Sequence, residues 1–194
     1  MSIFLLGANG TLGFQLALFG KKSLNYNITC LVRRFSVETD YLNSHGIRIL
    51  YGDMLDSKIL LESMFGSNVV IDAATGRNYE KIEDSDVAAK LMLLRFSEEL
   101  KMDHFVFFSL VSAEKFKGIP LVKAKLFLED RIKQSDVNYT IFRLTGFYQG
   151  IIKEYVIPII DKEFVYLIEE SIPISYIDCI DVARLVLRSF TSNR

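Results

Sequence analysis

The chain has few of the residues that build metal centres and disulfide frameworks. Its 194 residues include two cysteines, two histidines, three prolines and no tryptophan. Cys30 and Cys179 lie far apart in apolar segments, and His45 and His104 are isolated from other potential ligands. Metal sites need several Cys, His or acidic side chains at short, regular spacing. We therefore expect two buried, reduced thiols and no metal site.

Strong charge of one sign and long apolar runs are also missing. The chain carries 23 Lys and Arg against 24 Asp and Glu, a formal net charge of -1. Surfaces that bind nucleic acid carry clusters of basic residues, so we expect no direct binding of nucleic acid. No apolar run reaches the roughly 18 residues of a spanning helix. We expect no transmembrane segment and no signal or transit peptide before the first strand, because the first residues already belong to the fold.

Short apolar runs alternate along the chain with longer amphipathic segments, which is typical of βαβ units on a parallel sheet. We predict one domain over 1–194, an α/β fold with a Rossmann-type doubly wound parallel sheet and a small or truncated substrate-side lobe. Strands are expected at 2–6, 28–32, 47–51, 69–72, 104–109 and 139–143. Helices are expected at 11–20, 37–44, 57–64, 84–101, 120–134 and 180–190.

Two of the predicted helices carry recognisable start signals. Asp84 is a good N-cap for the helix at 84–101, and that helix has an apolar face. The face consists of Val87, Leu91, Leu94 and Leu100. Asp178 is suited to cap the last helix, with Asp181 in its first turn. We assign both acids structural roles.

A glycine-rich turn follows the first predicted strand and opens the first predicted helix. Backbone N–H groups at a helix N-terminus can hold a pyrophosphate, and glycines let the backbone approach it closely. The spacing is G-x-x-G-x-x-G rather than the commoner G-x-G-x-x-G, and any tight β–α turn also favours glycine. The residues expected to bind a dinucleotide here are Gly7, Asn9, Gly10, Thr11, Leu12 and Gly13.

The ends of the next three strands carry residues suited to the rest of a dinucleotide. Arg33 and Arg34 follow the second strand, where an arginine accommodates the 2′-phosphate of NADP and an acid would select NAD. No acid appears before Glu38. The alternative for the arginines is a solvated basic loop. Asp53 could accept from the adenine amino group, or cap the following helix. Small residues over which a ribose could lie follow the fourth strand: Ala73, Ala74 and Thr75.

The fifth strand and the helix after it raise the question of catalysis. Short-chain dehydrogenases place a serine at this strand end and Tyr-x-x-x-Lys on this helix, with the tyrosine as proton donor. Ser109 and Lys125 match, but Leu121 stands where the tyrosine should be. Either the site is silent or a lysine does the acid–base work alone. Lys125 is equally suited to bind ribose or to be a surface helix lysine.

Several segments together resemble the NmrA-like group of atypical short-chain dehydrogenases/reductases. Within it the chain is similar to one branch, the photosystem II assembly factors of cyanobacteria and plastids (hypothetical chloroplast open reading frame thirty-nine). The segments that carry the resemblance are 7–13, 30–35, 51–53, 107–109 and 139–144. The segments specific to the branch are 146–150, 155–159 and 174–178.

The resemblance implies an NADP(H)-binding protein without the usual catalytic tyrosine, which helps to assemble the photosystem II reaction centre. It implies a plastid-encoded protein in the chloroplast stroma, peripheral at the thylakoid. Its partners would be chlorophyll synthase, high-light-inducible proteins and the D1/D2 reaction-centre modules. Members of this branch continue well beyond this chain's last residue. Two alternatives stay open: an NADPH-dependent reductase of the isoflavone-reductase type that uses Lys125, and an NADP(H)-sensing regulator.

Overall fold

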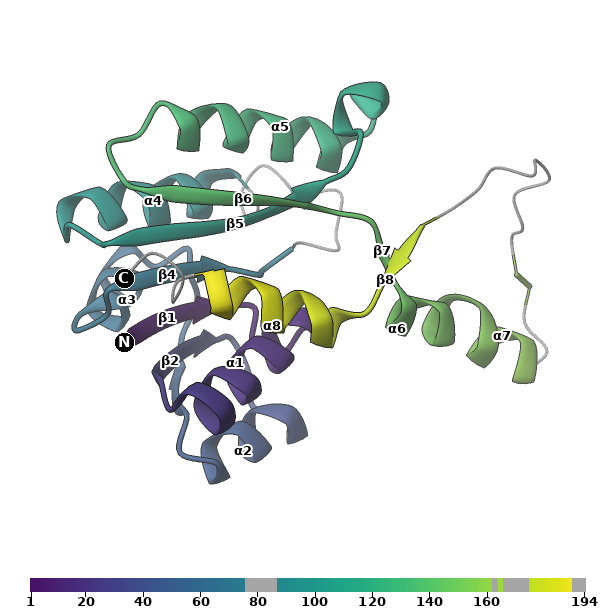
Figure 1. The fold of residues 1–194 in the computed structure, drawn as a ribbon, viewed down its shortest axis with the longest axis horizontal. Coiled ribbons are helices and arrows are strands. Elements are labelled where there is room, and N and C mark those ends of the chain that lie inside the picture. The colour runs from purple at the N-terminus through teal and green to yellow at the C-terminus, as the bar shows by residue number, and fades with distance from the viewer. Residues whose placement is uncertain (76–86, 162–163, 166–174, 190–194) are drawn as a thin grey trace.

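A parallel six-stranded sheet forms the centre of the molecule, in the order β3-β2-β1-β4-β5-β6. The structure is a computed structural model that describes residues 1–75, 87–161, 164–165 and 175–189 (Figure 1). The strands are β1 (Ser2–Leu6), β2 (Asn27–Val32), β3 (Arg48–Tyr51), β4 (Val69–Asp72), β5 (His104–Leu110) and β6 (Tyr139–Leu144). The order reverses between β1 and β4, which is where doubly wound sheets bind ligands. The predicted fold class is confirmed.

Helices cover both faces of the sheet (Figure 1). One face carries α1 (Thr11–Leu24), α2 (Val37–Ser44) and α8 (Cys179–Ser189). The other carries α3 (Ser57–Met64), α4 (Ala89–Glu99) and α5 (Pro120–Lys133). Both faces of a parallel sheet are therefore buried, which explains why its strands read as continuous apolar runs.

The apolar residues of strand β5 contribute to the hydrophobic cores on both faces of the sheet. Phe105 and Phe107 pack against α3, α4 and α5, while Val106 and Phe108 pack against the α1 and α8 side. Successive strand residues point to opposite faces, so every second residue joins the same core. All four side chains are buried. Full burial of one such side chain is worth about 1.5–3 kcal/mol.

A small lobe extends from the carboxyl end of the sheet (Figure 1). Here β7 (Gly146–Phe147) pairs in parallel with β8 (Tyr176–Ile177). Three short helices follow β7: α6 (Tyr148–Ile151), η4 (Ile152–Val156) and α7 (Ile157–Ile160). They expose large apolar side chains, among them Ile152, Ile157, Ile159 and Ile160. Of the helices that the structure describes, none has both the length and the apolar character needed to cross a membrane.

The end of α1 was predicted wrongly. The helix was expected to stop at Gly20 but runs on to Leu24, where Asn25 takes the left-handed conformation with φ 50°. Gly20 is buried inside the helix. A glycine is favoured there because a Cβ would lie 2.8 Å from Ile28 Cδ1. This glycine marks close packing of α1 on β2 rather than a helix end.

Helix α4 also differs from its prediction. It ends at Glu99, and Lys101 has a positive φ of 52°. Its buried face is centred on Lys90, Leu93 and Ser97, whereas Leu91 and Leu100 are only half-buried. The predicted cap Asp84 lies outside the described residues.

The start of α8 follows the prediction. Asp178 Oδ1 accepts a hydrogen bond from Ile180 N at 2.7 Å, and Asp181 lies in the first turn. The Gln149 side chain joins this cap to the lobe, because it donates to Asp178 at 2.9 Å and accepts from Cys179 N at 3.2 Å. The predicted cap is thus also an anchor for α6.

Candidate functional site

The three positions of the first turn that hold glycine differ in what a side chain would meet there. Gly7 has a φ of +86°, and a Cβ on it would lie 2.5 Å from the carbonyl of Ala73. A Cβ on Gly13 would lie 2.1 Å from Gly7 O. A Cβ on Gly10 would meet only Gly7 O, at 3.2 Å. Gly7 and Gly13 are therefore required by the protein's own backbone packing, whereas Gly10 leaves space that a bound group can use.

The N-terminus of α1 has no cap of its own. Its N-cap is Gly10, with no side-chain hydrogen bond and no acid in the first turn. Helices α4 and α5 also begin without a side-chain cap, whereas first-turn amides of α2, α3 and α8 donate to Ser36, Asp56 and Asp178. An uncapped first turn beside an open glycine suits an anion such as pyrophosphate. The predicted residues Asn9 and Thr11 are exposed here, and Leu12 is buried.

Strands β2 and β3 bring three predicted residues to the same edge of the sheet. Arg33 and Arg34 directly follow β2, Asp53 lies two residues after β3, and all three are exposed. Asp53 Oδ1 accepts from Leu55 N at 3.0 Å. The α3 cap is Asp56, which accepts from two amides at 3.0 and 3.1 Å. The alternative role of Asp53 as the helix cap is therefore wrong, and its contact with adenine stays a prediction.

The end of β4 lies directly against the glycine turn. Ala73 N donates to Leu6 O at 3.1 Å, Ala73 and Ala74 are half-buried, and Thr75 is exposed. Beneath them Lys90 Nζ lies 2.8 Å from Asp72 Oδ2, with both side chains almost fully buried. Sequence reasoning missed this pair. The available signal was a lysine on the buried face of the predicted helix.

The end of β5 brings together the two candidate catalytic residues. Ser109 is 2% exposed and Lys125 is 6% exposed. Lys125 Nζ donates to Phe108 O at 2.8 Å, so the alternative of a surface helix lysine is wrong. Leu121 lies half-buried one helical turn earlier and on the same side of α5, because residues i and i+4 share a face. The arrangement of Tyr-x-x-x-Lys is kept, with a leucine that cannot transfer a proton.

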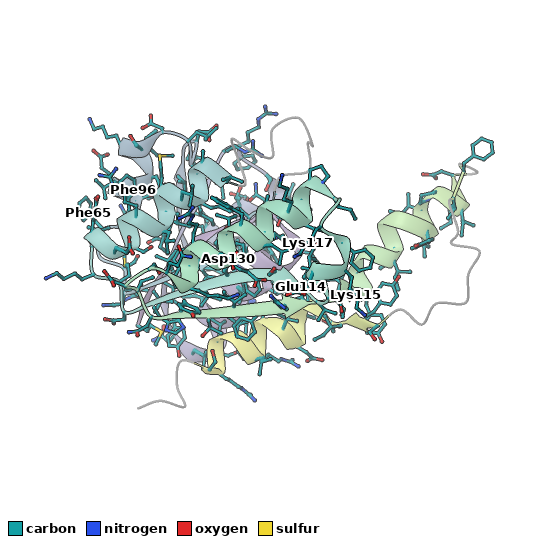
Figure 2. All side chains as sticks on the ribbon, turned by 90° about the horizontal axis from the view of Figure 1, so that it is seen from above. Phe65, Phe96, Glu114, Lys115, Lys117 and Asp130 are labelled. Carbon is teal, nitrogen blue, oxygen red and sulfur yellow. The ribbon has the colours of Figure 1, made fainter. Side chains whose placement is uncertain are left out.

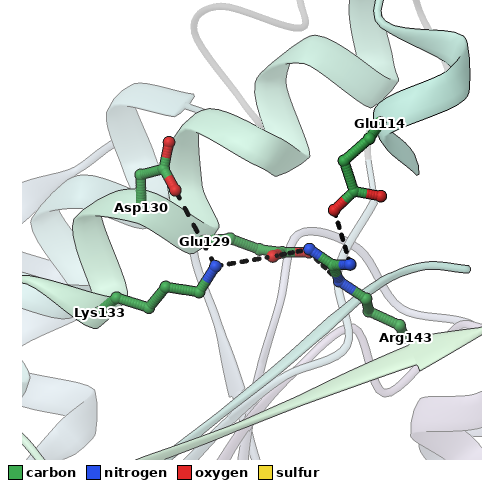
Figure 3. A network of polar contacts seen from close by, with 5 residues as sticks. All are labelled: Glu114, Glu129, Asp130, Lys133 and Arg143. Carbon is green, nitrogen blue, oxygen red and sulfur yellow. Dashed lines mark hydrogen bonds and ion pairs between the residues drawn. The ribbon is translucent and has the colours of Figure 1, made fainter. Parts of the chain in front are cut away.

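A buried carboxylate, Glu129, lies in a network between α5 and β6 (Figure 3). Arg143 donates to both oxygens of Glu129, at 3.0 and 2.6 Å. Arg143 also lies 2.7 Å from Glu114 of η3 (Ala113–Phe116), and Lys133 donates to Glu129 at 3.3 Å. The two parallel bonds of Arg143 are a strong, charge-assisted arrangement. Together with the contact to Glu114, these bonds of Arg143 join α5, β6 and the segment after β5.

Ser109 belongs to the same neighbourhood. It lies directly opposite Arg143 in the β5–β6 register. Burial alone raises the pKa of Glu129, but the hydrogen bonds from Arg143 and Lys133 and the neighbouring Ser109 hydroxyl outweigh burial and hold that pKa below its usual range. The hydroxyl of Ser109 therefore lies beside a structural carboxylate under α5.

The turn that Glu114 anchors lies toward the end of the sheet from which the small lobe extends (Figure 2). Figure 2 shows Glu114, Lys115 and Lys117 around this turn, far from Phe65 and Phe96 at the opposite end. Because Phe65 precedes the amino end of β4, the Glu114 turn lies toward the carboxyl ends of the strands. The ion network therefore braces the part of the sheet edge next to the candidate catalytic residues.

Both cysteines are buried and free, as predicted. Burial raises the pKa of the Cys30 thiol to about 12, so it stays protonated at physiological pH. Among the residues that the structure describes, no group of three or more His, Cys, Asp or Glu side chains could hold a metal ion.

The fold is shared with solved structures, among them two that hold a nicotinamide dinucleotide. One is UDP-glucuronic acid 4-epimerase from Bacillus cereus in complex with UDP-glucuronic acid and NAD, with a TM-score of 0.82 and 15% identity over 100% of this chain and 74% of that chain. The other is the Citrobacter sp. triphenylmethane reductase complexed with NADP(H), with a TM-score of 0.79 and 17% identity over 98% and 66%. At these identities the likeness shows the fold alone. One neighbour holds NAD and the other NADP(H), so the fold does not choose between them.

Sequence comparison is more specific. The chain is 37% identical over 202 residues to the photosystem II assembly factor Ycf39 of Cyanophora paradoxa, an alignment that takes in 100% of this chain and 62% of the relative. The chain therefore spans less than two thirds of that relative's length. Residues 7–193 match the family model described as NAD(P)H-binding. This match begins at the first glycine of the uncapped turn and takes in every strand end described above, and the chain belongs to the NAD(P)H-binding family.

Proposed function

We propose that this chain is the NADP(H)-binding part of a photosystem II assembly factor that acts by binding and not by turnover. The observation that carries the proposal is Leu121, an apolar side chain at the proton donor's position beside an otherwise suitable nucleotide cradle. General acid catalysis typically contributes about 10²–10⁴-fold to a rate. A reductase without its donor would therefore retain little activity, whereas nucleotide binding needs no donor.

We also propose NADP(H) rather than NAD(H) as the ligand. Arg33 and Arg34 are exposed where the second strand ends. Guanidinium groups form charge-assisted, often bidentate bonds with phosphate, and such bonds are stronger than neutral ones. The exposed position leaves both side chains able to turn toward a 2′-phosphate.

Each part of the site then has a role in binding. The space beside Gly10 and the free amides of the first turn of α1 would receive the pyrophosphate. Ala73, Ala74 and Thr75 would support the ribose, and Lys125 would contribute its ammonium group at the end of β5. When bound, NADPH supplies a hydride. Leu121, one helical turn before Lys125 on α5, has no proton to donate, so no proton would follow the hydride from this position.

Binding without turnover still has a physical consequence. A ligand at about 100 times its dissociation constant stabilises the native state by about 2.7 kcal/mol. The nucleotide would act as a structural ligand that fixes the turns after β1, β4 and β5 in one arrangement. A partner that recognises those turns would bind the occupied protein better than the empty one.

The proposed setting is the chloroplast stroma, at the surface of the thylakoid. The similarity to Ycf39 supports it, as does the resemblance to the plastid assembly-factor branch. The proposed partners are the D1/D2 reaction-centre modules, chlorophyll synthase and high-light-inducible proteins. The near-neutral charge of the chain supports protein partners rather than nucleic acid.

A second candidate is a working NADPH-dependent reductase with Lys125 as the acid–base residue. The buried position of Lys125 at the end of β5 favours it, because a lysine shielded from water is the kind that acts in proton transfer. The two candidates make different predictions for the same variants.

The test compares Gly10→Val, which should lose nucleotide binding, with Lys125→Ala, which should lose one contact, keep most of the affinity through the glycine turn and the arginines, and have no group to exchange a proton. Both are measured for NADPH binding by calorimetry, for NADPH oxidation with quinones and enones, and for photosystem II assembly in cells. We expect assembly to fail with Gly10→Val and to persist with Lys125→Ala. If Lys125→Ala retains nucleotide and assembly still fails equally, the reductase replaces the assembly factor.

A further inference from the structure

Two buried charged side chains hold from beneath the three described residues that follow β4, Ala73–Thr75, which we call the β4 turn. Lys90 Nζ donates to Ala74 O at 2.5 Å and lies 2.8 Å from Asp72 Oδ2. The other carboxylate oxygen, Asp72 Oδ1, accepts from Ala74 N at 3.2 Å. The lysine comes from α4 and the aspartate from the last position of β4. The backbone N–H and C=O groups of Ala74 are thus both held by the Lys90–Asp72 ion pair.

The turn that they fix is in direct contact with the glycine turn. A Cβ added to Gly7 would lie within 2.5–2.6 Å of the Ala73 carbonyl and of Ala74 N. Ala73 N also donates to Leu6 O at 3.1 Å, immediately before Gly7. Because the two backbones touch without a side chain between them, a displacement of the β4 turn would displace the glycine turn as well.

Burying an ion pair in a core carries a large desolvation free energy. Replacing such a pair with apolar side chains of similar volume is often neutral or stabilising. Lys90 lies on the buried face of α4 beside Leu93 and Leu94, where an apolar residue would pack well. An apolar pair could not donate to the Ala74 carbonyl or accept from its amide. The polar contacts to the turn are what distinguish the pair from an apolar core.

The same lysine also connects the ends of neighbouring strands. Lys90 Nζ lies 5.4 Å from the centre of the Phe107 ring, and Lys125 Nζ lies 5.1 Å from the same ring. Ammonium groups at this distance are attracted to an aromatic face. The β4 turn, held by Lys90, and the β5 end, held by Lys125, are therefore set relative to one another through one phenylalanine.

From these contacts we propose that Lys90 and Asp72 are positioning residues for the nucleotide site. They hold the β4 turn in the arrangement that completes the cradle at the glycine turn, without touching the nucleotide. This inference rests on the proposed binding of NADP(H) and adds to it the means by which the empty protein is preorganised. A site kept in its binding arrangement avoids the loss of affinity that a partly populated arrangement causes.

The test uses three variants of the chain. Lys90→Met removes the donor, Asp72→Leu with Lys90→Met replaces the whole pair by apolar side chains, and Ile132→Ala destabilises the same core at the distant end of α5. The dissociation constant for NADPH is measured by calorimetry at a temperature at which every variant is folded. Hydrogen exchange of the Ala73 amide is measured in the ligand-free protein, because its own bond to Leu6 is untouched by the substitutions.

We expect the double variant to be folded, to exchange the Ala73 amide faster, and to bind NADPH about tenfold more weakly, as it would if the binding arrangement were populated about one tenth of the time. Lys90→Met should behave similarly where it folds, and Ile132→Ala should bind like the native protein. A native dissociation constant in the double variant overturns the inference, as does an equal loss in Ile132→Ala. If the native protein binds neither NADPH nor NADH, the proposed function fails instead, and unchanged exchange at Ala73 would then overturn the positioning role separately.

Discussion

The two halves of the sheet's carboxyl edge handle charge in opposite ways. Beside β2 and β3, Arg33, Arg34 and Asp53 are exposed. Beside β4, β5 and β6, the chain buries four charged side chains, which are all of the buried charges among the described residues. These are Asp72, Lys90, Lys125 and Glu129. The first half offers its charges to a ligand, whereas the second half uses its charges to fix its own backbone.

The cost of burying charge explains the difference. A buried ion is tolerated only when partners satisfy it, so each of the four contacts a backbone carbonyl, an amide or an opposite charge. The described contacts of these four groups are with the protein's own backbone and side chains. Substitutions in the first half should therefore change nucleotide binding most, and substitutions in the second half should change stability and geometry most.

The largest expected effect is at Gly10. Gly10→Val should abolish detectable NADPH binding, because the side chain would fill the space left for the pyrophosphate. The fold should persist, with a loss of about 1 kcal/mol, since Gly10 has an ordinary φ of -84° and valine is a poorer N-cap. Circular dichroism and the shift of the melting temperature with NADPH measure both effects.

Two further glycines serve as controls for that variant. Gly13→Ala should unfold the protein or destabilise it by about 3 kcal/mol or more, because its Cβ would lie 2.1 Å from the carbonyl oxygen of Gly7. A Cβ on Gly118 would meet nothing within 4 Å, so Gly118→Ala should behave like the native chain. A full melting shift with NADPH in Gly10→Val would contradict the assigned site.

The next largest effect concerns the choice of nucleotide. Replacing Arg33 and Arg34 together by alanine should weaken NADPH binding by several kcal/mol, at about 1.5–3 kcal/mol for each charge-assisted bond. Binding of NADH, which lacks the 2′-phosphate, should change little. Calorimetric titration of both nucleotides measures this. Equal affinity of the native protein for NADPH and NADH would contradict the assignment of the arginines.

The contrast between the halves also explains what the sequence could predict. The six strands of the main sheet were predicted to within one residue at each end, because apolar runs and the glycine turn are local signals, whereas the two-residue strands β7 and β8 were not predicted. The contact of Asp72 with Lys90, and of Glu129 with Arg143, joins residues on different elements. No local pattern gives the register that brings such pairs together. A charged residue on an apolar helix face was the only hint, and it names no partner.

A middle-sized effect should appear when the Glu129 network is weakened. Glu129→Gln should lower the free energy of unfolding at pH 7 by about 2 kcal/mol, because charge-assisted bonds to Arg143 are lost. The pKa of Glu129 is held below its usual range, so its stabilisation is complete above the unfolded value of about 4.3 and is lost as pH falls through the lower folded value.

The difference in stability between native and Glu129→Gln should therefore be largest near pH 7 and shrink in acid below about pH 4.3. Urea unfolding at pH values from 7 down to 3 measures it. The control is Asp130→Asn on the same helix. Its carboxylate is exposed and lies 3.9 Å from Lys133, so it should change stability by less than about 1 kcal/mol. A difference that does not depend on pH would contradict the role assigned to Glu129.

The smallest expected effect separates a helix that caps itself from one that leaves its cap to a ligand. Asp56 accepts from two amides at the start of α3, so Asp56→Ala should cost about 1 kcal/mol of stability. That cost should be the same with and without NADPH, because α3 satisfies its own N-terminus. Helix α1 has Gly10 as its N-cap and no such side chain, and its first turn should gain protection from hydrogen exchange only when NADPH is bound. Hydrogen exchange of both helices, with and without nucleotide, makes the comparison within one protein. If the first turn of α1 is equally protected in the empty protein, its amides are already satisfied and the pyrophosphate must bind elsewhere.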